Sequence, residues 1–200
     1  MAYCDLTDLK AWLSIPDTDD DPILSAAAPA ASQWIDAYTG RSFTVASGTS
    51  TYYIEPRDTG WVVQVPDFAS TSGLVVETTS DHSTWTATTD FQPYPLNSTR
   101  YSVAFPYDEI RFLSAPPWPY DARPTIRVTA AYGWTAVPTA VEQACKIQAS
   151  RWFRRKDTPE GIAAGAEFGA IRVNSKLDPD VCALLDPFRK GGHAAGLVVG

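Results

Sequence analysis

The chain has 200 residues, 44% hydrophobic and 20% charged, which is the composition of a folded globular protein and not of a disordered one. Its formal net charge of -7 opposes non-specific binding to nucleic acids and to anionic membranes. It has no long uncharged apolar run that would predict a transmembrane helix, and the acidic start, with Asp5 and Asp8, does not resemble a secretory signal.

The first zone, from Thr7 to Gly40, is predicted to be helical. Thr7 is expected to cap a short helix that ends at Ile15-Pro16. A second helix should begin at Pro22, after the acidic run Asp17 to Asp21, and end at Gly40. Pro29 is expected to kink or split it. The side chains predicted to form the apolar sides of the two helices are Leu9, Trp12 and Leu13, then Ile23, Ala27, Ala30, Ala31, Trp34, Ile35 and Tyr38.

The second zone, from Arg41 to Trp134, is rich in Thr, Val and Tyr and predicts a small antiparallel β-domain. The Ser/Thr-rich stretch from Glu77 to Thr89 should form an exposed hairpin, and Phe91 to Leu96 and Ala115 to Pro119 should be Pro-rich connections. The predicted strands are Thr51 to Ile54, Trp61 to Val65, Leu74 to Glu77, Ile110 to Leu113 and Thr125 to Thr129.

The third zone returns to helix. One helix should begin at Val137-Pro138, bury an apolar face and end in a basic cluster. A long loop is expected from Thr158 to Asn174, followed by a short helix capped by Asp178 and a Gly-rich tail from Gly191 to Gly200. The predicted buried residues are Val141, Ala144, Cys145, Ala149, Trp152 and Phe153, then Val181, Leu184, Leu185 and Phe188.

These zones predict an α+β fold in which a small α-helical bundle, built from the N- and C-terminal helices, contains an inserted antiparallel β-domain. The expected boundaries are 1–40 and 135–190 for the helical core, 41–134 for the β-domain and 191–200 for the extended tail.

The sequence does not predict a catalytic, cofactor or metal site. His82 and His193 lie in a predicted turn and in the Gly-rich tail, where neither ring is held firmly, so both are expected to be solvent-exposed. Cys4, Cys145 and Cys182 are too scattered for a zinc site or a disulfide framework, fit synthesis in a reducing cytoplasm, and are expected to behave as small hydrophobes. The acidic run lacks the glycine and distal Glu of a calcium loop, which favours an exposed helix entry.

Three features leave alternatives open. The basic cluster Arg151, Arg154, Arg155 and Lys156 could bind DNA, although the net acidity and the helix dipole favour a subunit interface formed by Arg151, Arg154 and Arg155. The aromatic β-domain could bind carbohydrate through Trp61 or Trp85, although core packing explains most of its aromatics. The tail, with Leu197, Val198 and Val199, is either a disordered end or a segment ordered by docking on a partner.

The chain resembles the head-to-tail connector (adaptor) proteins of siphovirus-type tailed bacteriophages. The segments that carry the resemblance are YCDLTDLKAWLSI with WIDAYTGR, then YGWTAVPTAVEQACKIQASRWFRRKD, then EFGAIRVNSKLDPDVCALLDPFRK. They cover the helical zones and not the β-domain.

This resemblance implies a non-enzymatic virion protein that is assembled in the host cytoplasm and forms a homo-oligomeric ring, a dodecamer, beneath the portal. The ring would extend the DNA channel, let genomic DNA pass without specific binding, and carry the next connector component, a stopper or tail terminator. It implies no cofactor and no membrane. The segment from Phe188 to Gly200 would face the portal, through Phe188, Arg189, Lys190, Leu197, Val198 and Val199.

Overall fold

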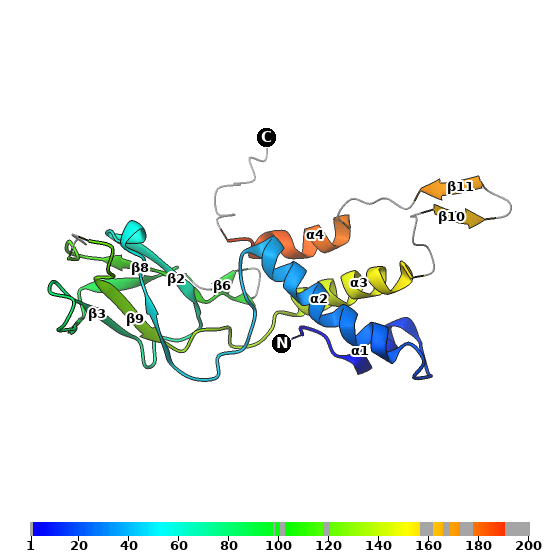
Figure 1. The fold of residues 1–200 in the computed structure, drawn as a ribbon, viewed down its shortest axis with the longest axis horizontal. Helices are drawn as coiled ribbons and strands as arrows, with labels where there is room; N and C mark the ends of the chain where they lie inside the picture. Colours follow the sequence, from blue (N-terminus) through cyan, green and yellow to red (C-terminus); the bar gives the residue numbers. More distant parts are fainter. Residues whose placement is uncertain are drawn as a thin grey trace. The chain divides into compact units, whose positions relative to one another are not determined.

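In the computed structural model, the described residues are 2–97, 99–100, 103–117, 121–156, 162–165, 169–172 and 178–190. The chain forms two compact units, one of Met1–Arg41 with Val137–Gly200 and one of Ser42–Ala136 (Figure 1). The first unit holds the helices and the second holds antiparallel sheets, so the predicted α+β fold with an inserted β part is confirmed. Among the described helices, none combines the length and the apolar character needed to cross a membrane.

Two helices open the chain, α1 (Leu6–Leu13) and α2 (Asp21–Thr39). The cap of α1 is Asp5 and not Thr7 as predicted, because the Asp5 carboxylate accepts a hydrogen bond of 2.7 Å from the backbone N–H of Asp8. Trp12, predicted to be on the apolar side, is 48% exposed, because an eight-residue helix buries only a narrow stripe, here Leu9.

The second helix is continuous through Pro29, so the predicted split is wrong. Pro29 lies on the exposed face of α2, where water can satisfy the carbonyl group that its missing N–H leaves unpaired. Ile23 and Ala30, predicted to be apolar-side residues, are also exposed. The buried face of α2 is formed by Leu24, Ala27, Ala28, Ala31, Ser32, Ile35 and Thr39.

The rest of the helical unit comes from the second half of the chain. It consists of α3 (Thr139–Arg154), a hairpin of β10 (Ile162–Gly165) and β11 (Gly169–Arg172), α4 (Pro179–Leu185) and the short 3₁₀ helix η2 (Asp186–Phe188). The long loop predicted from Thr158 to Asn174 is therefore interrupted by paired strands, which the glycines of this stretch concealed from a pattern search. The predicted cap of α4 is confirmed, because the Asp178 side chain accepts from the N–H of Asp180.

Small residues let the helices of this unit approach closely. The helix α2, whose buried alanines are Ala27, Ala28 and Ala31, packs against α3, which carries Ala144 and Ala149 on its own buried face. In turn, α3 packs against α4. Burial of these faces, and not helix propensity, supplies most of the stability of such short helices.

The β unit contains two main antiparallel sheets. The first has the strand order β1-β9-β3-β4 and the second the order β2-β8-β5, so strands that are neighbours in the sheets are mostly distant in the sequence. The strands are β1 (Ser50–Tyr53), β2 (Val62–Phe68), β3 (Val75–Thr78), β4 (Thr86–Thr88), β5 (Phe91–Tyr94), β8 (Tyr107–Phe112) and β9 (Ile126–Ala130), with a separate pair β6 (Thr99–Arg100) and β7 (Val103–Ala104) and a 3₁₀ helix η1 (Pro56–Asp58).

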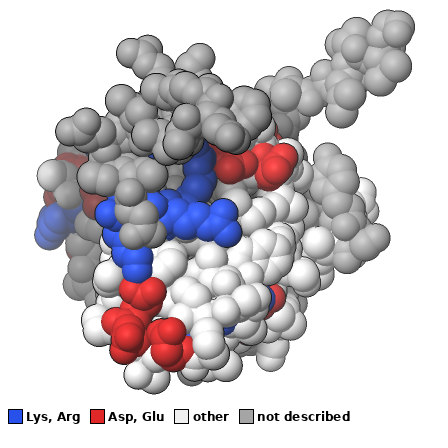
Figure 2. Space-filling model, turned by 90° about the vertical axis from the view of Figure 1, so that its right-hand side faces the viewer, with Lys and Arg blue, Asp and Glu red and all other residues white. Residues whose placement is uncertain are grey.

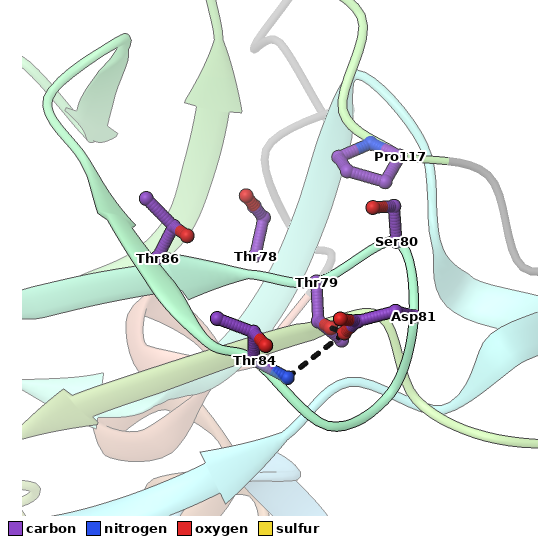
Figure 3. Close-up of a pocket in the computed structure, with 7 residues that line it drawn as sticks. All are labelled: Thr78, Thr79, Ser80, Asp81, Thr84, Thr86 and Pro117. Atoms are coloured by element: carbon purple, nitrogen blue, oxygen red, sulfur yellow. Dashed lines mark hydrogen bonds between the residues drawn. The ribbon is translucent and has the colours of Figure 1, made fainter.

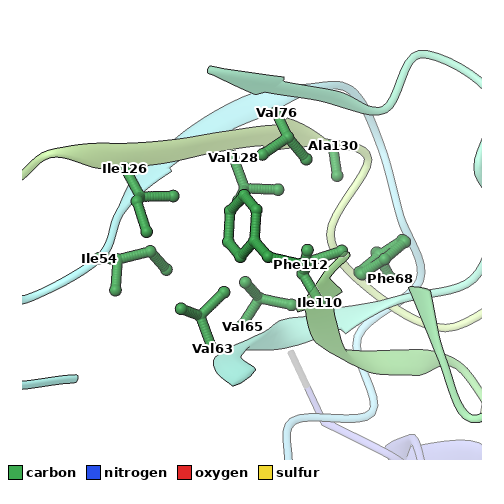
Figure 4. Close-up of a cluster of buried hydrophobic side chains, with 10 residues drawn as sticks. All are labelled: Ile54, Val63, Val65, Phe68, Val76, Ile110, Phe112, Ile126, Val128 and Ala130. Carbon is green, nitrogen blue, oxygen red and sulfur yellow. The ribbon is translucent and has the colours of Figure 1, made fainter. Parts of the chain in front are cut away.

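The apolar faces of the two sheets share one core (Figure 4). Val76 and Val128 of the first sheet lie on one side of it, Val65 and Ile110 of the second on the other, and the ring of Phe112 fills the space between. Alternate residues of β9 are buried, which is the period of a strand with one face toward a core.

Both edges of the second sheet carry a proline, Pro66 in β2 and Pro93 in β5. Phe91 to Leu96, predicted to be a connection, contains the strand β5 because an edge strand can accept a residue that donates no hydrogen bond. The Ser/Thr-rich stretch after Glu77 forms the predicted hairpin between β3 and β4.

Candidate assembly surfaces

The C-terminal end of α3 gathers the predicted basic cluster. Figure 2 views the side of the molecule on which α3 ends and shows Lys and Arg side chains beside Asp and Glu side chains. Cations at this position offset the partial negative charge of the helix C-terminus.

Two members of the cluster stabilise their own subunit. Arg151 Nη1 lies 3.6 Å from Asp178 Oδ2 and so links α3 to the capping residue of α4. Lys156 pairs with Asp20 at the start of α2, and its Nζ lies 4.2 Å from the centre of the Phe153 ring. Both cations therefore help to hold the helical unit together.

Arg154 and Arg155 are the other two members of the cluster. Arg154 is in the last turn of α3, Arg155 caps it, and both side chains are exposed. Two adjacent exposed guanidinium groups can each bind a carboxylate or a phosphate through two hydrogen bonds. Of the three predicted subunit-interface residues, Arg151 thus links two helices of its own unit, and Arg154 and Arg155 are exposed.

The acidic run before α2 contributes to the same unit. Lys10 Nζ lies 2.6 Å from Asp21 Oδ1, so α1 is tied to the start of α2. Asp17 and Asp19 are exposed. Within the described part of the chain, no cluster of three or more His, Cys, Asp or Glu side chains could hold a metal ion.

The segment from Asp186 to Lys190, here called the tail root, is fixed to the end of α2. The backbone N–H of Lys190 donates to the carbonyl of Thr39 at 2.7 Å. Arg41 Nε donates to the carbonyl of Phe188 at 2.9 Å. The hydroxyl of Tyr38 donates to Asp186 Oδ1 at 2.7 Å, which raises the pKa of that tyrosine. The direction in which the chain leaves the helical unit is therefore determined by hydrogen bonds.

The predicted portal-facing residues fall into three groups. Phe188 is only 4% exposed and is buried within its own subunit. Arg189 and Lys190 are exposed, and the Arg189 guanidinium lies 5.2 Å from the centre of the Tyr38 ring. Leu197, Val198 and Val199 lie outside the described residues.

The two tryptophans named for carbohydrate binding have different surroundings. Trp61 is 55% exposed at the start of the second sheet. Trp85 is half-buried, with the Arg127 guanidinium 4.5 Å from its ring centre and the ring of Tyr53 edge-on at 5.9 Å. Arg127 also forms a bidentate pair with Glu77. Trp85 is thus part of the packing of the first sheet, whereas Trp61 is available to solvent.

A polar cavity of about 340 Å³ lies beside the β3–β4 hairpin (Figure 3). Its lining is dominated by hydroxyl groups and by Asp81, whose Oδ1 accepts from the backbone N–H groups of Thr84 and Ser83 and from the hydroxyl of Thr79. These bonds hold the pKa of Asp81 far below its usual range. The carboxylate therefore shapes the turn and is a poor general base.

His82, next to Asp81, is less exposed than predicted. Its side chain is 10% exposed, with Nδ1 3.3 Å from the carbonyl oxygen of Pro124 and Nε2 3.5 Å from Asp121 Oδ1. The prediction of a solvent-exposed ring was wrong because the loop before β9 covers it. His193 lies outside the described residues.

The comparisons with known proteins agree with the sequence resemblance. Residues 3–65 match the model of the phage gp6-like head-tail connector protein family. No curated protein matches the chain.

Among solved structures, a chain in the neck of an empty gene transfer agent particle computed with C6 symmetry is similar, with a TM-score of 0.54 and 16% identity over 92% of this chain and 87% of that chain. A chain in the neck of the native particle computed with C12 symmetry has a TM-score of 0.48 and 17% identity over 83% of this chain and 81% of that one. A chain in the native virion has a TM-score of 0.48 and 20% identity over 85% and 78% of the two chains.

The first of these structures shows that the α+β fold described above occurs in a particle neck. The family match covers α1, α2, β1 and the start of β2. The resemblance inferred from the sequence is therefore confirmed: over residues 3–65 this chain carries the pattern of the phage gp6-like head-tail connector proteins.

Proposed function

We propose that this protein is a structural subunit of the head–tail junction of a tailed phage or phage-like particle, where identical copies form a ring beneath the portal. The match of residues 3–65 to the connector family carries the proposal. The similar fold in a neck solved with sixfold symmetry supports it, since a ring of twelve subunits contains that symmetry.

In this proposal the tail root serves as the base of the portal contact. Phe188 acts by holding the root against α2, while Arg189, Lys190 and the residues beyond, including Leu197, Val198 and Val199, contact the portal. The hydrogen bonds from the Lys190 backbone to Thr39 and from Arg41 to the Phe188 carbonyl support this division of roles, because they fix the path of the backbone that carries the exposed side chains.

Arg154 and Arg155 are proposed to pair with carboxylates of a neighbouring subunit, and Arg151 to support them from within. The exposure of Arg154 and Arg155 supports the first role, and the ion pair of Arg151 with Asp178 supports the second. The net charge of -7 suits a channel through which DNA passes without binding. A ring of this kind, which also carries the next component of the junction, requires no catalysis.

Co-sedimentation with portal rings of the same particle tests the portal contact. Full-length protein and a version ending at Lys190 are compared, since the shorter version keeps the bond from Lys190 to Thr39. Binding by the full-length protein that is lost on truncation is expected. If neither version sediments with the portal, the connector proposal is refuted, and equal sedimentation of both would refute the role of the tail.

The subunit interface is tested separately with Arg154→Glu/Arg155→Glu, by counting subunits per portal in electron micrographs. Arg57→Glu is the matched control, because Arg57 is an exposed arginine in the β unit. Incomplete rings are expected for the double variant only. Complete rings for the double variant as well as for the control would refute the proposal that Arg154 and Arg155 lie in the subunit interface. Salt-sensitive DNA binding that is lost in the double variant would assign them instead to phosphate contacts.

A further inference from the structure

Two of the three cysteines meet inside the helical unit. Cys4, in the segment before α1, and Cys145, in the middle of α3, are 141 positions apart, and their sulfur atoms lie 2.8 Å from each other. A disulfide bond needs about 2.05 Å. A sub-ångström displacement of two side chains would therefore bring the sulfur atoms to bonding distance.

We propose that Cys4 and Cys145 form an oxidation-sensitive pair that peroxide converts into an intramolecular disulfide, which joins the N-terminal segment to α3. The three scattered cysteines do not predict a framework of several disulfides. A single bond between Cys4 and Cys145 is compatible with that prediction, and Cys182 would remain a free thiol.

The surroundings of the pair favour an ionised sulfur at Cys145. Ser32 Oγ lies 3.5 Å from Cys145 Sγ and also accepts from the backbone N–H of Tyr3. The hydrogen bond with Cys4 is the main cause that lowers the pKa of Cys145, and the same bond is the main cause that raises the pKa of Cys4. Cys145 is therefore the sulfur that attacks first, because a thiolate is the reactive form.

The chemistry balances with peroxide as the oxidant. The Cys145 thiolate attacks one peroxide oxygen, an S–O bond forms as the O–O bond breaks, and the departing hydroxide takes up a proton to become water. The sulfur of Cys4 then loses its proton and attacks Cys145. The S–S bond forms as the S–O bond breaks, and the oxygen leaves as a second water. Two thiols are oxidised and one peroxide is reduced to two waters.

Access selects the kind of oxidant. Cys4 is 4% exposed and Cys145 is fully buried, so a bulky disulfide reagent reaches them only when the N-terminal segment opens. A small peroxide is better suited. In a reducing cytoplasm the pair stays as thiols, and the cross-link forms after the protein meets an oxidising environment.

The test uses purified full-length protein, reduced, freed of reductant and treated with hydrogen peroxide. The number of free thiols measured after denaturation is expected to fall from three to one. Peptide mapping without reductant should then show one linked pair of peptides, containing Cys4 and Cys145. The melting temperature of the helical circular dichroism signal should rise on oxidation and return when reductant is added, because the cross-link restricts the unfolded chain.

Cys182→Ser is the matched control and should behave like the unmodified protein, whereas Cys4→Ser and Cys145→Ser should show no linked peptide and no rise in melting temperature. The peptide map of the unmodified protein decides the matter even if a variant folds poorly. A linkage that involves Cys182, a linkage between two chains, or sulfinic acid at Cys145 with Cys4 still a thiol would overturn the proposal.

Discussion

Phe188→Ala should release the tail root from the helical unit. A phenylalanine side chain buries about 150–250 Å², and at about 25 cal/mol per Å² that burial is worth roughly 4–6 kcal/mol. Phe188 is 4% exposed, so nearly all of this burial energy applies. The alanine side chain retains part of the burial energy, and residues around η2 can partly fill the space that the ring leaves. The expected loss is about 3–4 kcal/mol of unfolding free energy.

Hydrogen exchange measures the local consequence. The backbone N–H of Lys190, bonded to the carbonyl of Thr39, should lose most of its protection in the variant, while amides of the central strand β8 keep theirs. Leu113→Ala is the control, because that side chain is 67% exposed and its loss should cost less than about 0.5 kcal/mol. A variant that loses under about 1 kcal/mol and keeps Lys190 protected would refute the reasoning.

Three further predictions concern particular residues. Pro29→Ala should raise the unfolding free energy of the helical unit by roughly 1–3 kcal/mol, because alanine restores a backbone donor inside α2, and a lower denaturant midpoint would contradict this. Gly133→Ala should destabilise the β unit by roughly 3 kcal/mol or more, seen as a lower midpoint in tryptophan fluorescence, since its φ is +133° and an added Cβ would lie 2.6 Å from the carbonyl oxygen of Thr44. The hydrogen bonds from Arg127 lower the pKa of Glu77, so the stability that this carboxylate adds is present at neutral pH and declines as the pH falls below about 4.5 through its folded-state pKa. Glu77→Gln should reduce this decline in unfolding free energy at acid pH, by less than about 1 kcal/mol. An unchanged decline would argue against a stabilising pair of Glu77 with Arg127.

The sequence by itself determined the elements whose pattern is strong and local. The strand predicted from Thr125 to Thr129 is β9, and the apolar period of α3 identified the buried face of that helix. Burial on one side imposes a period of 3.6 residues on a helix, which a short window of sequence already shows. The connector resemblance also lay in the order of such local segments, and it was confirmed over residues 3–65.

Local patterns failed where the position of a residue in the fold, or a choice between adjacent residues, decided the outcome. Pro29 stays inside one helix because its face of α2 is exposed, and Pro93 stays inside a strand because β5 is an edge. Asp5 caps α1 in place of the predicted Thr7. Both residue types are good helix caps, so the sequence alone does not decide between them.

Only the tertiary structure decided which distant residues meet. Cys4 and Cys145 come together because α3 packs beside the N-terminal segment, and Phe188 is buried because Arg41 and Thr39 hold the chain at the end of α2. The sheet order β1-β9-β3-β4 likewise joins strands that are far apart in the chain. Each of these contacts depends on the sum of many small packing energies over the whole unit, and no window of sequence contains that sum.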